Sequence, residues 1–424
     1  MKLVRSASLN QNYLIMTLNS TPENKLLIPL HRDAQGELYF YDKKISDVVQ
    51  DYSRPRYVYH LPALRYRATE FKKYAERYLG ANFQIHYAMK ANCHHELLSA
   101  FSTAGIGMDV VSGGELMLCQ NLQIDPQKII YSGVGKTKKE ILASIEAEIF
   151  QINVESVPEL LRISEISKSL NKSIGIGLRV NPNVDVQTHP HIATGFRDNK
   201  FGIDMAELPQ ALEVIKSNAL IRFQGLSLHI GSQIFDFSPV KMAIEKLLKL
   251  HKDLLLQGYK LTTFDIGGGV GVDYRKDGSE DFNILEDYFK TVSSALEGLE
   301  AKILCEPGRF LASRSGILLT EVQYVKQTPW KKFIICDTGM NHIIRPVLYE
   351  AYHRILPVRQ RDGSLQSVDI VGPVCESADF LAKNRDMPPV AEGDLLVIAE
   401  AGAYGQVMSS SYNLFPQPMV QIIK

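Results

Sequence analysis

The chain has 424 residues, which is enough for two ordinary domains and a large buried core. Hydrophobic residues make up 45% of it and charged residues 22%, an ordinary globular composition that excludes a disordered chain. Lys plus Arg and Asp plus Glu both total 47. This balanced charge gives no reason to expect nucleic acid or an anionic membrane as a partner, so any bound anion must be held by local design.

The cysteines and the chain start indicate the compartment. The five cysteines are scattered and include no CxxC pair, so we predict neither a metal site nor a disulfide framework. Free thiols suit a reducing cytosol. No apolar stretch of signal-peptide length follows Met1–Arg5, and no run approaches the roughly 18 apolar residues of a membrane span. We expect a cytoplasmic protein.

The first 54 residues are mixed and polar, with short strand-like pieces at Leu26–Leu30 and Leu38–Tyr41. From about Tyr57 onward, short apolar or β-branched runs alternate with longer amphipathic stretches, a pattern typical of βα units around a parallel sheet. The candidate strands of this part are residues 84–88, 107–111, 129–131, 150–153, 174–180, 223–229, 263–266 and 302–306. Helix-like segments include residues 63–78, 157–170, 208–217 and 240–256.

Eight or so such units over about 250 residues match a (β/α)8 barrel, with a doubly wound open sheet as the alternative. After about residue 310 the helical rhythm fades. Strand-like runs follow at residues 317–322, 332–336, 367–371 and 395–398, broken by Gly and Pro. We therefore predict an α/β fold with three parts: N-terminal strands over 1–54 that pack with the β-rich domain, a barrel over 55–310, and a β-rich domain over 311–424.

In such a barrel the active site lies at the C-terminal ends of the strands, so polar residues at those ends are candidates for chemistry. Lys90 directly follows the strand at 84–88. Apolar walls in the barrel mouth can depress the pKa of its amine and free it for imine formation. The plainer alternative is a solvated lysine at a helix start.

Two further strand ends carry candidates for anion binding. His229 is followed by Gly231 and Ser232, which can bind a phosphate oxygen, although a lone histidine is more often structural. Gly267-Gly268-Gly269 follows an apolar strand, and its backbone N–H groups can converge on an anion without hindrance from side chains. A tight turn at the barrel rim is the alternative for the glycines.

The last strand end and one cysteine complete the candidates. Glu306 begins the sequence Glu306-Pro307-Gly308-Arg309, whose carboxylate can pair with a protonated ring nitrogen and whose amides can bind phosphate. Read alone, these four residues are only a charged turn. Cys375 can be a proton donor if it is partly exposed, and is otherwise a small buried cysteine.

Together these motifs resemble the alanine-racemase-fold, or type III, decarboxylases that use pyridoxal phosphate, and most closely their diaminopimelate decarboxylase family. The resemblance covers about Tyr57 to Asn413. The motifs are Tyr87-Ala88-Met89-Lys90-Ala91-Asn92, His229-Ile230-Gly231-Ser232-Gln233, Gly267-Gly268-Gly269, Cys305-Glu306-Pro307-Gly308-Arg309, Gly339-Met340-Asn341 to Arg345-Pro346, Leu348-Tyr349-Glu350-Ala351-Tyr352-His353, Cys375-Glu376-Ser377, and Ala403-Tyr404-Gly405 with Met408-Ser409-Ser410. Each string alone is weak, but eight in the right order outweigh the separate alternatives.

The resemblance implies a role for each motif. Lys90 would carry pyridoxal 5'-phosphate. Cys375 would protonate the α carbon of the substrate and would come from the other subunit of a head-to-tail homodimer. Besides Lys90, the residues that would contact or support the cofactor are Asp109, Arg179, His229, Ser232, Gly269, Glu306, Gly308, Arg309 and Tyr404. His229 would stack on the ring and Glu306 would pair with its nitrogen, while Ser232, the backbone amides and Tyr404 would hold the phosphate.

Substrate choice must come from the far end of the amino acid. The residues expected there are Arg309, Arg345, Tyr349, Glu376 and Tyr404. Arg309 and Arg345 can grip a distal carboxylate, and Glu376 can receive a distal ammonium. Since ornithine-like substrates have no distal carboxylate, we expect decarboxylation of meso-2,6-diaminopimelate to L-lysine and CO2, the last step of lysine biosynthesis.

The sequence departs from the resemblance at Leu414-Phe415-Pro416, where many family members carry an arginine before the proline, and it ends at Lys424 without the usual arginine-rich tail. The nearest rival function is a decarboxylase of the same fold acting on arginine, ornithine, a D-amino acid or a carrier-tethered substrate. A racemase, a catalytically inactive regulatory homologue and a simple cofactor carrier are further alternatives. The presence of both Lys90 and Cys375 argues against the inactive homologue, and the C-terminal segments with Cys375 and Tyr404 argue against a carrier, which would need only the barrel.

Overall fold

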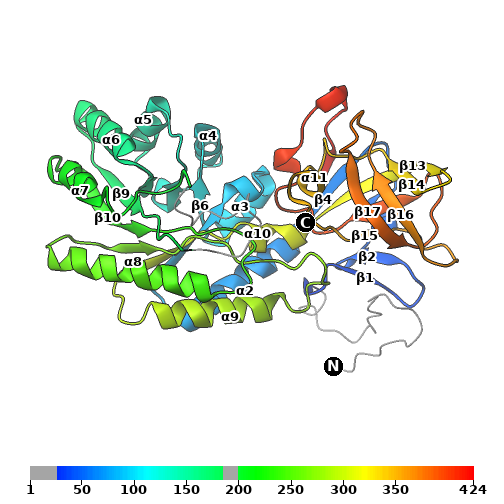
Figure 1. Ribbon diagram of the computed structural model, residues 1–424, viewed down its shortest axis with the longest axis horizontal. Helices are drawn as coiled ribbons and strands as arrows, with labels where there is room; N and C mark the ends of the chain where they lie inside the picture. The colour runs from blue at the N-terminus through cyan, green and yellow to red at the C-terminus, as the bar shows by residue number, and fades with distance from the viewer. Residues whose placement is uncertain (1–25, 185–198) are drawn as a thin grey trace. The chain divides into compact units, whose positions relative to one another are not determined.

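The computed structural model describes residues 26–184 and 199–424 (Figure 1). The chain forms two compact units. The barrel unit consists of Arg67–Gly271 and Phe282–Leu311. The β unit consists of the described part of Met1–Tyr66 together with Val272–Asp281 and Ala312–Lys424. The chain therefore leaves the barrel unit after residue 271, adds ten residues to the β unit, and returns.

Within the described residues the barrel unit contains a closed barrel of eight parallel strands. They are β5 (Phe83–Ala88), β6 (Gly107–Val110), β7 (Ile129–Tyr131), β8 (Gln151–Val154), β9 (Ile174–Arg179), β10 (Ile221–Ser227), β11 (Thr263–Asp265) and β12 (Lys302–Cys305). Each strand pairs with its neighbours in chain order, and β12 closes the ring by pairing with β5. The predicted (β/α)8 barrel is confirmed, and the open sheet is excluded.

Helices follow the strands and lie outside the barrel in Figure 1. They are α2 (Leu61–Leu79), α3 (His95–Thr103), α4 (Gly113–Asn121), α5 (Lys138–Glu146), α6 (Val157–Leu170), α7 (Leu208–Lys216), α8 (Ser238–Leu256), α9 (Asp281–Ala295) and the short α10 (Arg309–Ala312). Side-chain N-caps begin four of them: Ser112, Thr137 and Ser156 each accept a backbone N–H from the glutamate three residues on, and His94 accepts that of Glu96. These caps fix where the loops after the strands end. The four predicted helices are confirmed within α2, α6, α7 and α8.

The β unit is built on a second sheet with the order β15-β18-β13-β14-β16-β17. In addition β4 pairs with β13, and β19 pairs with β4. Its strands are β4 (Arg56–His60), β13 (Gly316–Gln327), β14 (Lys332–Cys336), β15 (Ile355–Pro357), β16 (Gln366–Val371), β17 (Phe380–Met387), β18 (Leu395–Ile398) and β19 (Met419–Ile423). The short helix α11 (Arg345–Tyr349) lies between β14 and β15 in the chain. The predicted β-rich region after residue 310 is confirmed as a sheet.

A small antiparallel sheet, β1 (Leu30–Arg32), β2 (Leu38–Phe40) and β3 (Lys43–Lys44), precedes the helix α1 (Ile45–Val48). Its Leu30, Leu38 and Phe40 pack into one core with residues of β4, β13 and β18. The strand expected at Leu26–Leu30 is wrong, because the ladder begins only at Leu30. Pro29 has no N–H to donate to a ladder, so pairing can start only after it.

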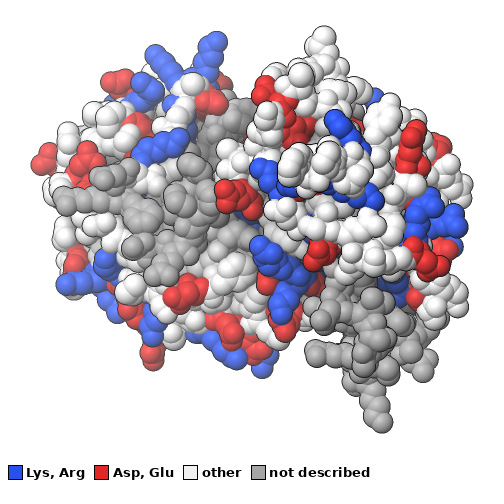
Figure 2. Space-filling view, turned by 45° about the vertical axis from the view of Figure 1, so that its right-hand side comes forward, with Lys and Arg blue, Asp and Glu red and all other residues white. Residues whose placement is uncertain are grey.

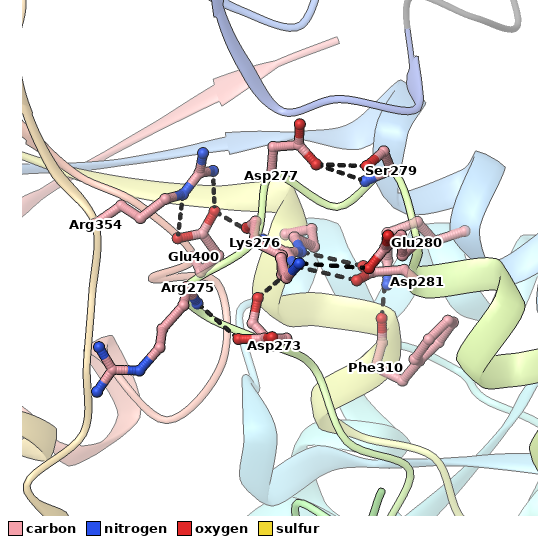
Figure 3. Close-up of polar contacts among 12 residues, drawn as sticks. Asp273, Arg275, Lys276, Asp277, Ser279, Glu280, Asp281, Phe310, Arg354 and Glu400 are labelled. Atoms are coloured by element: carbon pink, nitrogen blue, oxygen red, sulfur yellow. Dashed lines mark hydrogen bonds and ion pairs between the residues drawn. The ribbon is translucent and has the colours of Figure 1, made fainter. Parts of the chain in front are cut away.

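Arg314 is the hub of a buried ion network in the β unit. Its five N–H donors all have acceptors: both Asp281 carboxyl oxygens (3.0 Å each), one Glu400 oxygen (2.9 Å), and the carbonyl oxygens of Asp273 (2.8 Å) and Lys276 (2.9 Å). Arg314 is 0% exposed. Figure 3 shows Glu400 with its second partner, Arg354, beside the loop from Asp273 to Asp281. One guanidinium thus ties this loop to the end of the sheet.

The face seen in Figure 2 shows no large patch of like charge, because basic and acidic side chains are interspersed on it. That face gives no electrostatic reason to expect a polyanionic partner. Within residues 26–184 and 199–424, no helix has both the length and the apolar composition needed to cross a membrane.

We predict that Arg314→Met lowers the free energy of unfolding by about 3–5 kcal/mol, because it leaves the buried Asp281 carboxylate without its cation and Glu400 with Arg354 alone. Urea unfolding followed by circular dichroism measures the loss. Arg361→Met is the control, since Arg361 pairs with Asp394 at the surface and exposed pairs contribute little. Equal losses in the two variants would contradict a special role for the buried network.

Candidate active site

Residues that the sequence analysis selected in the barrel unit all lie at or just beyond the C-terminal ends of strands. Lys90 follows β5, Asp109 is in β6, Arg179 ends β9, His229 and Ser232 follow β10, Gly269 follows β11, and Glu306, Gly308 and Arg309 follow β12. The C-terminal ends of parallel strands meet at one end of a closed barrel. The barrel therefore gathers this whole set at one mouth.

Lys90 lies in the turn Met89–Ala91 and is exposed, although both of its neighbours are buried. The turn packs against the one that follows β12, because a Cβ on Gly308 would lie 3.1 Å from the Cβ atoms of Ala88 and Ala91. The positive charge of Lys90 lowers the pKa values of the buried Asp109 and Glu306, in part offsetting the effect of burial. The amine thus emerges from an apolar floor beside buried carboxyl groups.

Three carboxyl groups, here called the carboxyl cluster, are buried in the mouth: Asp109 (1% exposed), Asp265 (0%) and Glu306 (9%). Burial, followed by the negative charge of Glu306, raises the pKa of Asp109 to about 7. Burial raises the pKa of Asp265 to about 6. The pKa of Glu306 is raised well above its usual range by burial and by the neighbouring Asp265. Near neutral pH the cluster therefore retains at least one proton.

His229 is a neutral imidazole in this setting. Burial, followed by the charges of Lys90 and Arg179, lowers its pKa well below the usual value. The Gly268 N–H donates to Nδ1 (3.2 Å), so the ring proton is on Nε2. An uncharged ring in this position can stack on a flat ligand without adding a charge.

Arg179 is held by a buried carboxylate at the same end of the barrel. Its Nη1 donates to Glu155 Oε1 (2.7 Å), and its Nη2 lies 3.5 Å from the His229 carbonyl oxygen. Glu155 also accepts the N–H groups of Gly133 (3.1 Å) and Gly202 (2.8 Å). The supporting role expected for Arg179 is consistent with this fixed position, and remains a prediction.

The glycine turn is tightly packed against its neighbours. Gly269 has φ +110°, and a Cβ there would meet the Gly231 carbonyl oxygen at 2.6 Å. The N–H of Gly267 is taken by Asp265 (2.9 Å) and that of Gly268 by His229. Gly269 is therefore the residue of the turn whose amide we assign to an anion.

Ser232 and Arg309 meet at the same end of the barrel, where Arg309 Nη2 donates to Ser232 Oγ (3.2 Å). A guanidinium and a hydroxyl beside a glycine turn suit a phosphate group. The buried Asp109 carboxyl, which has the Ser132 hydroxyl as a polar neighbour, is also suited to a polar ligand. These features fit the pyridoxal phosphate that the resemblance implies.

Two of the expected substrate residues lie on α11 of the β unit. Arg345 begins the helix, is 4% exposed, and donates from Nη1 to His353 Nε2 (2.8 Å). Its guanidinium also lies 4.4 Å from the ring centroid of Tyr274. Tyr349 ends the helix and is half-buried. The polar neighbours of Arg345 fix the direction of its side chain.

The other candidates of the β unit lie in turns. Cys375 and Glu376 are both exposed, so the alternative of a small buried cysteine is wrong. The Cys375 N–H donates to Asn413 Oδ1 (3.1 Å), and the Tyr412 hydroxyl donates to Glu376 Oε1. Tyr404 is half-buried and has φ +55°. Whether these residues act together with Lys90 remains a prediction.

Sequence reasoning missed several residues of the site. Asp265 lies two residues before Gly267 at the end of β11, and Asn153 ends a predicted strand, so both carried the signal of a polar residue at a strand end. Tyr412 carried no local signal, because its partner Glu376 comes from another turn. His353 stood in one of the motifs but was given no role, because its contact with Arg345 of α11 depends on the fold. Within residues 26–184 and 199–424, no cluster of three or more His, Cys, Asp or Glu side chains is arranged to hold a metal ion.

We predict that Asp109→Asn flattens the pH dependence of stability in the cofactor-free protein. The folded pKa of Asp109 is about 7 against an ordinary 3.8, so the fold keeps a proton that the unfolded chain releases. Stability therefore falls as pH rises between these values, by up to about 1.4 kcal/mol per pH unit for this proton. Urea unfolding across that range measures the slope.

Wild type and variant are compared with each other because His229, with its lowered pKa, contributes a slope of opposite sign. Parallel curves for the two proteins would contradict the buried protonated state of Asp109.

Known proteins match the barrel unit and, over a longer stretch, about nine-tenths of the chain. Residues 65–313 match the family described as pyridoxal-dependent decarboxylase, pyridoxal binding domain. The diaminopimelate decarboxylase of Aquifex aeolicus is 41% identical over 382 residues, covering 90% of this chain and 89% of that protein. The enzyme of Vibrio cholerae with the same name is 39% identical over 383 residues, covering 90% of each.

Two solved structures are similar over most of their length. The diaminopimelate decarboxylase of Helicobacter pylori complexed with L-lysine has a TM-score of 0.84 and 36% identity, covering 90% of this chain and 94% of that one. The one from M. jannaschii, also with L-lysine, has a TM-score of 0.85 and 31% identity, covering 94% and 93%. The chain belongs to the pyridoxal-dependent decarboxylases, and among them to the diaminopimelate decarboxylase family.

Proposed function

We propose that this chain decarboxylates meso-2,6-diaminopimelate to L-lysine and CO2, with pyridoxal phosphate held through Lys90. The observation that carries the proposal is the position of Lys90, an exposed amine on a buried turn beside the carboxyl cluster at the barrel mouth. The relatives named diaminopimelate decarboxylase, two of which were solved with L-lysine, support this substrate and product.

When bound, the cofactor supplies a sink for the electron pair that CO2 leaves behind at the α carbon. The barrel residues bind and orient it. Ser232, Arg309 and the Gly269 amide would hold the phosphate, and the neutral ring of His229 would pack against the pyridine. Glu306 would pair with the ring nitrogen and favour a proton there, which would strengthen the withdrawal of electrons.

Cys375 returns a proton to the α carbon, the role for which its exposed thiol suits it. We propose that it does so across the interface of a homodimer, where residues 311–424 of one protomer complete the site of the other. Tyr404 contributes to the phosphate site from the same region of the chain.

Charged side chains recognise the distal carboxylate and ammonium groups of the substrate. Arg345 binds the distal carboxylate, with Arg309 as a second cation, because a guanidinium presents two parallel N–H donors to a carboxylate. Glu376, oriented by the hydroxyl of Tyr412, receives the distal ammonium, and Tyr349 borders it. Amino acids with only one carboxylate leave Arg345 without its partner, which costs affinity.

We predict that the cofactor-loaded protein releases CO2 from meso-diaminopimelate in clear preference to L-arginine, L-ornithine, L-lysine and D-lysine. Lys90→Ala abolishes both the release and the visible absorption of the bound cofactor, because the amine that carries the cofactor is gone. Lys72→Ala, which changes an exposed lysine of α2, is the control and leaves both unchanged. If the protein preferred ornithine or arginine, the role of the cofactor would be supported but the assignment of meso-diaminopimelate as the substrate would be wrong.

We predict that Arg345→Met lowers kcat/KM for meso-diaminopimelate by about 100-fold, since a site that loses the partner of a charged substrate group loses about that much. Slow turnover of L-ornithine, which has no distal carboxylate, stays within about twofold. Arg359→Met, at an exposed position nearby in the chain, is the control. Equal losses for both substrates would show that Arg345 serves the fold rather than selection.

A further inference from the structure

A line of buried polar side chains crosses the interior of the barrel. Thr263 Oγ1 on β11 donates to Gln151 Oε1 on β8 (3.0 Å), and Gln151 Nε2 donates to Asn153 Oδ1 (2.7 Å). Asn153 Nδ2 then donates to Asp265 Oδ2 (3.2 Å) and to Glu306 Oε1 (3.3 Å). All five side chains are buried. The line therefore ends on two members of the carboxyl cluster.

The line fixes which way the Asn153 amide points. Its Oδ1 accepts the N–H of Gln151, whose own carbonyl oxygen accepts the Thr263 hydroxyl. A flipped Asn153 would set its N–H against the N–H of Gln151 and its oxygen against two carboxyl groups. Nδ2 is therefore held toward Asp265 and Glu306.

Two glycines of the barrel make room for this line. A Cβ on Gly177 of β9 would meet Gln151 Nε2 at 2.5 Å and Asn153 Oδ1 at 2.9 Å. A Cβ on Gly225 of β10 would meet Thr263 Oγ1 at 2.4 Å and its carbonyl oxygen at 2.0 Å. The absence of side chains at these two positions leaves space for the amides of β8 and the hydroxyl of β11.

We propose that Asn153 is a positioning residue for decarboxylation: its side-chain amide orients Glu306 and keeps the Glu306 carboxylate ionised, so that the proton between Glu306 and the cofactor ring stays on the ring nitrogen. The inference rests on the proposed function, which assigns Glu306 to that nitrogen.

The physical reason is a competition for one proton. Burial and the neighbouring Asp265 both raise the pKa of Glu306, while the charges of Lys90 and Arg179 lower it, and Asp109 is close enough for Glu306 to raise its pKa. Left to burial alone, Glu306 would take the proton from the ring nitrogen, and the ring would become a poorer electron sink. An amide N–H stabilises the carboxylate without bringing a charge of its own.

The test uses Asn153→Leu, which removes the amide at similar shape, loaded with pyridoxal phosphate carrying 15N in the ring. The 15N resonance of the ring nitrogen reports its protonation. We expect the ratio of protonated to unprotonated ring nitrogen to fall about tenfold, the usual effect of losing a hydrogen bond to a charged group. kcat should fall by a similar factor while KM changes little, since Asn153 is only 1% exposed and acts through Glu306.

Two milder variants keep the test decisive if Asn153→Leu does not fold. Gln151→Met removes the donor that holds Asn153 Oδ1, and Gly177→Ala pushes a methyl group against both amides. Each should shift the ring-nitrogen ratio in the same direction by a smaller factor. Asn218→Leu is the matched control, because Asn218 is a buried amide that donates to Ser164 and Ser167 on α6, away from the strand ends. It should lower the thermal midpoint and leave the ratio unchanged.

A ring-nitrogen ratio that stays at the wild-type value in the folded, cofactor-loaded variants would overturn the inference and leave Asn153 a structural residue. The inference would also be overturned if Asn218→Leu shifted the ring-nitrogen ratio as much as the variants of the buried polar line do. A wild-type protein that binds no cofactor at Lys90 would overturn the proposed function as well, so the two failures are distinguishable.

Discussion

Burial of three carboxyl groups in the barrel mouth is the constraint around which this site is organised. Asp109, Asp265 and Glu306 are all nearly inaccessible to water, and moving a carboxylate out of water is expensive. The fold meets this cost with retained protons, with the positive charges of Lys90 and Arg179, and with the neutral N–H donor of Asn153. The carboxyl cluster can therefore gain or release a proton, and so change its net charge, when a ligand with a titratable group binds.

The β unit handles the same difficulty in a different way. Asp281 and Glu400 are buried as deeply, but the Arg314 guanidinium supplies a donor to each and fills its remaining N–H groups with backbone carbonyls. A fully paired network has no proton to exchange and no site for a ligand, so it serves the structure. This contrast is the reason to assign function to the carboxyl cluster, whose carboxyl groups are incompletely paired, and not to the Arg314 network.

The sequence was sufficient for the parts of the fold that repeat. Alternating apolar runs located the barrel strands, and the polar residues after them, such as Lys90 and Glu306, followed from the rule that parallel strands end together. Asn153 was missed as a participant because its role depends on which residues of β8, β9 and β11 face one another inside the barrel. Residues 272–281 were missed as part of the β unit because their attachment depends on Arg314, more than thirty positions away.

Alternation along β8 makes the interior line possible. Gln151 and Asn153 lie two residues apart and share the inner face, while Ile152 and Val154 point the other way, toward the helices. In the pairing with β9, Asn153 lies opposite Gly177, whose missing side chain leaves the space that the two amides occupy. A shift of one residue in this pairing would turn both amides out of the barrel and bury two aliphatic side chains against the carboxyl groups. The register of one short strand thus decides whether Glu306 has the Asn153 N–H as a neutral donor in addition to the Ser132 hydroxyl (3.4 Å). Through that amide it influences the charge that the barrel offers to a ring nitrogen.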